Sequence, residues 1–170
     1  MTRSVMLSVF TAFALATACA SENSTAPTFD GGIAAAKSSN RVPVDRPFKG
    51  DCDLVSRGLI FTGPTTATQI VDGTCNLTHL GRSTVLITDN IDFTVLSYSS
   101  VTIFTAANGD ELHTTLNGFA TPSSTGLTLA GTMLVTGGTG RFVNARGSAA
   151  HSGVVIAFTA TSHLEGRLIY

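Results

Sequence analysis

The fold of this chain is decided by the stretch Gly137-Gly138-Thr139-Gly140-Arg141-Phe142-Val143-Asn144-Ala145-Arg146-Gly147. Before it, apolar and small polar residues alternate from 127 to 136, which predicts an extended strand with one apolar face. Glycine tolerates positive φ angles and close backbone contact, so Gly137, Gly138 and Gly140 predict a tight reversal. In this reversal Phe142 folds back onto the strand as a hydrophobic plug.

The same glycines do not form a nucleotide-binding loop. A P-loop requires a Lys and a Ser or Thr after its last glycine, at the start of a helix, whereas Arg141-Phe142-Val143 follow here without a helical apolar period. The third glycine of a dinucleotide-binding fingerprint is also missing. We therefore expect no nucleotide site at this corner.

The stretch closely resembles the GGTG-x-F-x-x-A-x-G signature of the dirigent and allene oxide cyclase families, and of small secreted bacterial proteins similar to them. The match covers Gly137 to Phe142 and Ala145 to Gly147, and a looser resemblance extends from Thr74 to Tyr170. The resemblance implies an all-β fold, a single antiparallel closed barrel of about eight strands with an apolar interior. The acidic and polar barrel residues of the plant enzymes have no residue-by-residue match here, so the resemblance implies the fold and not the activity.

Alternating runs separated by turn signals predict the strands, and no segment has a helical period. Asn108-Gly109-Asp110 is a strong hairpin signal between two of them. This spacing is typical of a sandwich or a barrel, and the resemblance favours the barrel. The predicted strands are Gly58–Thr62, Thr68–Leu80, Ser83–Ser97, Val101–Ala106, Glu111–Ala120, Leu127–Thr136, Ser148–Val155 and Ile156–Tyr170.

The first 44 residues predict export. A short basic start followed by an apolar run from Val5 to Ala18 predicts a signal peptide over 1–18. Leu15-Ala16-Thr17-Ala18-Cys19 resembles a bacterial lipobox, so we expect lipidation of Cys19; the alternative is ordinary cleavage after an A-x-A triplet. The protein would be a lipoprotein of the bacterial cell envelope, held to the membrane by the lipid only, or secreted or periplasmic without it. Residues 19–44 predict a flexible linker, followed by the barrel domain over 45–170.

The cysteines predict one disulfide. With Cys19 assigned to lipid, Cys52 and Cys75 form an even pair in an oxidising compartment. The alternative is two free buried thiols. The four histidines are scattered singly, without close Cys or His partners at ligand spacing, so we expect no metal site and no cofactor.

Two polar residues fall in phase with apolar ones and are the candidates for catalysis. His79 shares the phase of Val71 and Cys75 and could line the barrel as a general base, although a core or rim histidine satisfied by a carbonyl is the more common case. Asp89 shares the phase of Ile87 and Ile91. It is either a carboxylate inside the barrel or the mark of a β-bulge near Asp89-Asn90, and we expect the bulge.

Charge excludes nucleic acid as a partner. The chain has a net charge of −1, contains no basic run and has no tryptophan. The sequence predicts an exported protein that binds a small hydrophobic ligand in its barrel or has a structural or interaction role in the envelope, where homo-oligomers could form. The alternative is a cyclase or isomerase that shapes a reactive hydrophobic intermediate, which depends on analogy of fold alone.

Overall fold

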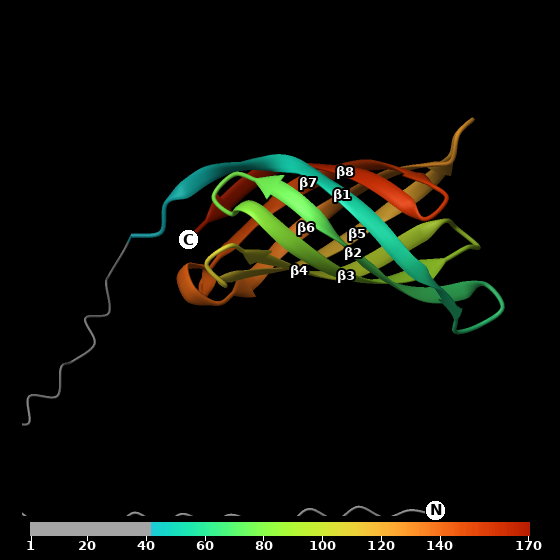
Figure 1. The fold of residues 1–170 in the computed structure, drawn as a ribbon, viewed down its shortest axis with the longest axis horizontal. Coiled ribbons are helices and arrows are strands. Elements are labelled where there is room, and N and C mark those ends of the chain that lie inside the picture. Colours follow the sequence, from blue (N-terminus) through green and yellow to red (C-terminus); the bar gives the residue numbers. More distant parts are fainter. Residues whose placement is uncertain (1–41) are drawn as a thin grey trace, which may run out of the picture. The chain divides into compact units, whose positions relative to one another are not determined.

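A computed structural model gives the fold, and it describes residues 42–170 (Figure 1). The predicted signal peptide, the predicted lipidation residue Cys19 and nearly all of the predicted linker lie outside the described residues and stay predictions. Within 42–170, no helix is long and apolar enough to cross a bilayer.

Eight strands form one closed antiparallel barrel in which each strand pairs with the next and β8 pairs with β1. The predicted fold class is therefore confirmed. The strands are β1 (Asp45–Phe61), β2 (Thr66–Leu77), β3 (Gly81–Asp92), β4 (Ser97–Ala106), β5 (Glu111–Pro122), β6 (Leu127–Gly138), β7 (Arg146–Ile156) and β8 (Thr159–Ile169), with the short 3-10 helix η1 (Gly140–Phe142) between β6 and β7.

Several predicted strands had wrong boundaries; for example, β3 ends at Asp92 and not at Ser97. The first was expected from Gly58, but β1 begins at Asp45, and the buried Phe48, Cys52 and Leu54 alternate with exposed residues along it. The register then shifts between Ser56 and Leu59, which brings Leu59 opposite Gln69. The last strand was expected from Ile156, whereas Ala157, with a φ of 54°, lies in the turn before β8.

The glycine stretch closes one end of the barrel, and the predicted plug is present. Phe142 is fully buried together with Phe48, Leu112 and Leu168, and its ring centroid lies 5.0 Å from that of Tyr170. Both ends of the described chain lie at this end, because the Val44 amide donates to the Tyr170 carbonyl at 3.3 Å. We call it the closed end.

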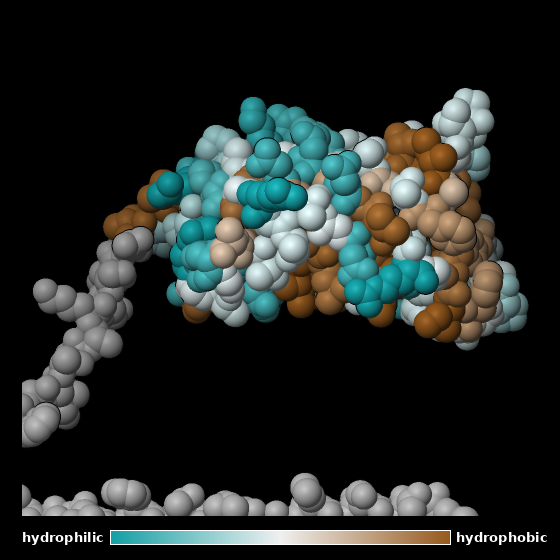
Figure 2. Space-filling model, viewed as in Figure 1, coloured by the Kyte–Doolittle hydropathy of each residue, from teal (hydrophilic) through white to brown (hydrophobic). Residues whose placement is uncertain are grey.

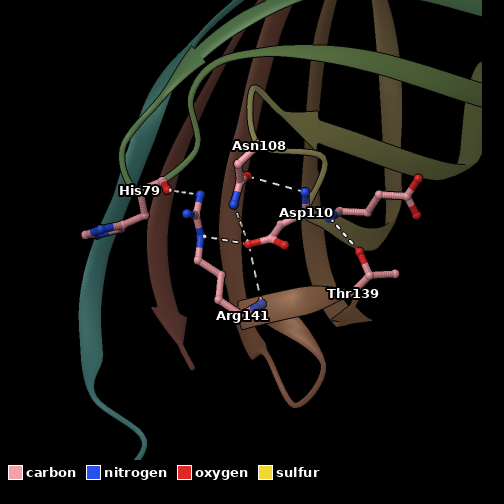
Figure 3. A network of polar contacts seen from close by, with 6 residues as sticks. His79, Asn108, Asp110, Thr139 and Arg141 are labelled. Carbon is pink, nitrogen blue, oxygen red and sulfur yellow. Dashed lines mark hydrogen bonds and ion pairs between the residues drawn. The ribbon is translucent and has the colours of Figure 1, made fainter. Parts of the chain in front are cut away.

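A polar network joins three connections at the closed end (Figure 3). The Asp110 carboxylate accepts from the Asn108 side-chain amide at 2.9 Å and lies 3.7 Å from Nε of Arg141. Arg141 in turn donates through Nη2 to the His79 carbonyl at 2.9 Å. The connections after β2, β4 and β6 are thereby fixed over the plug.

The predicted disulfide joins Cys52 of β1 to Cys75 of β2, and both residues are buried. The two cysteines are direct cross-strand partners, with Cα atoms 4.0 Å apart. Cross-linking a loop of this length contributes about 3 kcal/mol by the chain-entropy estimate.

Gly140→Ala should destabilise the fold more than Gly81→Ala. Both glycines have positive φ, 53° and 68°, so an alanine costs about 1–2 kcal/mol in backbone strain at either position. A Cβ at Gly81 meets open space, whereas a Cβ at Gly140 collides with the Asp110 carboxylate and displaces it from Arg141. Urea unfolding midpoints of the two variants measure the difference, and equal losses would show that the Asp110 network contributes nothing.

Candidate functional site

The barrel interior changes along its axis. Towards the closed end the inward-facing side chains are fully buried, as for Leu77, Phe104 and Met133. Towards the other end, formed by the connections 62–65, 93–96, 123–126 and 157–158, inward-facing residues such as Ile91 and Leu129 are partly exposed. Phe61 and Phe93 stand in the inward phase at the rim, 67% and 38% exposed, with ring centroids 6.0 Å apart. We call this part the open half.

Asp89 lies inside the barrel where the two halves meet. Its carboxylate accepts hydrogen bonds from the Ser100 hydroxyl on β4 and, at 2.8 Å, from the Gln69 side-chain amide on β2. Gln69 in turn accepts from the Ser56 hydroxyl at 2.7 Å. Burial raises the pKa of Asp89, and the bonds from Ser100 and Gln69 partly offset that shift.

The expected bulge at Asp89-Asn90 is wrong. The pairing of β3 runs without a shift to Asp92, from Gly81 with β2 and from Ser83 with β4, so Asp89 keeps the inward phase of Ile87 and Ile91. Regular pairing leaves no unpaired residue to turn the carboxylate outward. The alternative weighed for the sequence, a carboxylate inside the barrel, is the correct one.

A second polar group crosses the interior from β4 to β8. The Tyr98 hydroxyl lies 2.9 Å from Nδ1 of His151 on β7, and Nε2 of His151 lies 2.8 Å from the Ser162 hydroxyl on β8. The intervening strands present Gly118 and Gly131 below the Tyr98 side chain, and a Cβ at Gly118 would collide with its hydroxyl. These two glycines give the tyrosine room to reach across.

The environment keeps this group uncharged near neutral pH. Burial lowers the pKa of His151 to about 4, and burial together with the negative charge of Asp89 raises the pKa of Tyr98 to about 12. A neutral imidazole has one N–H donor and one acceptor, so it must donate to one hydroxyl and accept from the other. Tyr98, His151 and Ser162 therefore form a neutral hydrogen-bonded chain that has two proton arrangements.

The other catalytic candidate, His79, does not join this site. β2 ends at Leu77, and His79 lies in the turn at the closed end with a φ of 70°. Its Nε2 is 2.9 Å from the Pro47 carbonyl, and its ring packs edge-on to Tyr170. The preferred interpretation, a rim histidine satisfied by a backbone carbonyl, is therefore the correct one. The alternative, in which His79 lines the barrel through the phase of β2, is wrong because the strand stops before it.

Sequence reasoning missed Tyr98, His151 and the serine and glutamine partners. Each is a polar residue in the inward phase of its strand, as His151 is between Ala149 and Gly153. That phase is the signal that could have identified them, although it does not say which strands bring them together. The other two histidines lie on the outer face, where His113 bonds to Glu111 and His163 to Asp51.

Among residues 42–170, no group of three or more His, Cys, Asp or Glu side chains could hold a metal ion. The group around Asp89 contains one carboxylate, with Ser100 and Gln69 as its partners.

No family model and no curated protein matches this chain. Among solved structures, it is similar to a pterocarpan synthase dirigent protein, GePTS1, with 16% sequence identity and a TM-score of 0.49. The alignment covers 75% of this chain and 91% of that one. A likeness at this level says nothing about activity or ligand.

Acid should destabilise the barrel through His151. Its pKa is about 4 in the folded state against an ordinary 6.5, so between these values the unfolded chain binds the proton and the folded one does not. The contribution of neutral His151 is complete above about pH 6.5 and falls as the pH approaches 4, by roughly 3 kcal/mol. Asp89 acts in the opposite direction, because protonation relieves the cost of its buried charge.

Chemical unfolding of the wild type and of His151→Gln, measured between pH 7 and pH 4, isolates the histidine from Asp89. The variant should lose the His151-dependent part of the pH profile. His163→Gln on the outer face is the matched control and should keep the wild-type profile. If His151→Gln follows the wild type over the whole range, His151 is not held neutral by the fold.

Proposed function

We propose that the open half of the barrel binds one small, largely apolar molecule whose polar group meets a floor formed by Asp89, Tyr98 and His151. One observation carries the proposal: these polar groups lie inside the barrel where the inward-facing residues change from buried to partly exposed. A barrel filled only for stability would bury apolar side chains here. Polar groups placed against that rule are expected at functional sites.

The hydrogen-bonding capacity of the floor is only partly used. An ionised carboxylate has about four acceptor positions, and Asp89 uses one on each oxygen, towards Ser100 and Gln69. Its remaining positions suit a ligand hydroxyl or N–H group. Tyr98 and His151 offer further contacts of either kind, because the proton arrangement of their chain can reverse.

The surroundings favour an apolar ligand without negative charge. Leu54, Val71 and Leu116 are buried near the floor, and Ile91 and Leu129 line the wall above them. Along the described strands, no Lys or Arg has the inward phase in the open half; the pairing of Arg57 with Asp72 holds it on the outer face. An anion would therefore meet Asp89 with no compensating cation.

Shaping of a cyclisation or isomerisation is the second candidate. The favouring observation is that Asp89 acts on the pKa of Tyr98, so a potential base and a hydrogen-bonded hydroxyl chain lie in one site. A base with a raised pKa and a chain that can pass a proton are the elements of general acid–base catalysis. Recovery of the ligand in chemically unchanged form after prolonged incubation with the protein would contradict this candidate.

Asp89→Leu should weaken binding of N-phenyl-1-naphthylamine, a neutral apolar dye with one N–H donor that fluoresces in apolar sites. Leucine has the shape of aspartate without its acceptors, so the dye should bind about tenfold less tightly. Dye titration measures the affinity. Native mass spectrometry of protein from a periplasmic host, followed by solvent extraction, identifies any molecule acquired in the cell.

Asp51→Leu, the same change on the outer face, is the control and should bind the dye as the wild type does. Urea unfolding checks that both variants are folded. Equal affinity in the wild type and in Asp89→Leu would place the dye outside the proposed site. Absence of both dye binding and a co-purified molecule would indicate a filled barrel and a structural role.

Export and lipidation, predicted from Ala18-Cys19, complete the proposal and depend on the sequence alone. In a bacterial host that receives labelled fatty acid, the wild-type chain should incorporate the label and Cys19→Ser should not. Cys52→Ser is the matched control, since its thiol is assigned to the disulfide and not to lipid. A wild-type chain that incorporates no label would show that the lipobox is not used.

A further inference from the structure

The open end of the barrel carries exposed aromatic side chains. The four exposed phenylalanines of the described chain lie there: Phe61, Phe93, Phe119 and Phe158, between 38% and 67% exposed. Ile60, Val95 and Ile156 are exposed beside them. Figure 2 shows the resulting contrast, with hydrophobic surface gathered at the end opposite the start of β1 and hydrophilic surface towards the closed end.

Charged residues have the opposite distribution and are absent from the connections at the open end. The connections 62–65, 93–96, 123–126 and 157–158 contain no charged residue. The nearest acid, Asp92, turns its carboxylate to the Thr94 amide at 2.7 Å. At the closed end, by contrast, Asp110 and Arg141 lie within the connections themselves. The barrel is thus amphipathic along its axis.

We propose that the open end docks on a lipid surface, with its aromatic tips inserted at the boundary between headgroups and acyl chains. Exposed apolar patches rimmed by polar residues mark interaction sites, and acyl chains adapt to side chains that stand on several separate hairpins. Because these connections carry no Lys or Arg, docking requires no anionic lipid and is insensitive to salt. The inference is independent of any ligand in the barrel.

The absence of tryptophan from the chain permits a local test with the full-length protein. Phe158→Trp places a single fluorophore at the open end, and Val143→Trp places one at the closed end, at positions 64% and 59% exposed. Phosphatidylcholine vesicles should shift the emission of Phe158→Trp to shorter wavelength, and brominated phosphatidylcholine should quench it. Val143→Trp should show neither change, even if another part of the chain holds the protein on the vesicle.

The affinity of docking is tested in the Phe158→Trp background. Adding Phe61→Ser and Phe119→Ser should weaken vesicle binding at least about tenfold. The matched pair Val101→Ser and Leu134→Ser, exposed on the outer face between the two ends, should leave binding unchanged. Binding should persist when phosphatidylcholine is titrated in high salt.

Three results would overturn the proposal. The first is an emission of Phe158→Trp that vesicles do not change. The second is an equal response of Phe158→Trp and Val143→Trp. The third is a shift that depends on protein concentration without vesicles, which would identify a second copy of the chain as the occupant of the open end.

Discussion

Pairing of β1 with both β2 and β8 is the constraint on which the remaining structure depends. It closes the sheet, so no edge strand is left in the barrel and each inward-facing residue points into one shared interior. The disulfide between Cys52 and Cys75 ties β1 to β2 within that interior. A closed sheet of fixed strand number encloses a fixed width, and the side chains decide which part of it is filled.

Side chains fill the closed end and the open half of the barrel to different extents. Phe48, Phe142 and Leu168 fill the closed end, and the Asp110–Arg141 network holds the connections across them. Gly118 and Gly131 have no side chains to fill the interior, so Tyr98 occupies the space beside them and reaches His151. Replacing Asp89 and His151 by apolar residues would remove the free-energy cost of burying the carboxylate and of keeping the imidazole neutral. The presence of these polar residues therefore argues for a functional role and not for a role in stability.

Strand alternation is a local property, so the sequence allowed a sandwich or a barrel to be predicted, and the family resemblance carried by the glycine corner favoured the barrel. The plug formed by Phe142 was predicted correctly from the glycine corner, and the pairing of Cys52 with Cys75 from the even number of cysteines that remains once Cys19 is assigned to lipid. The site was predicted only at Asp89, and there the bulge was preferred. For His79, the preferred rim position was correct, and the barrel-lining alternative failed because periodicity gives the phase of a strand and not its end. Tyr98 and His151 meet only through closure of the barrel, with two strands between them, and no spacing along the chain encodes that contact.

The difference between the two ends of the barrel links the plug, the charged network and the exposed phenylalanines. The glycine corner needs polar partners such as Asp110, because its connections must be held over the plug, and this places charge at the closed end. The connections at the open end do not cover a plug, and they carry phenylalanine and small uncharged residues instead. The ligand that we propose would then enter the open half from the side on which the surface itself is apolar. A polar floor reached through an apolar rim would select for molecules that have both a polar group and an apolar body. The floor would bind the polar group and the apolar wall would bind the body, and neither surface alone would bind both.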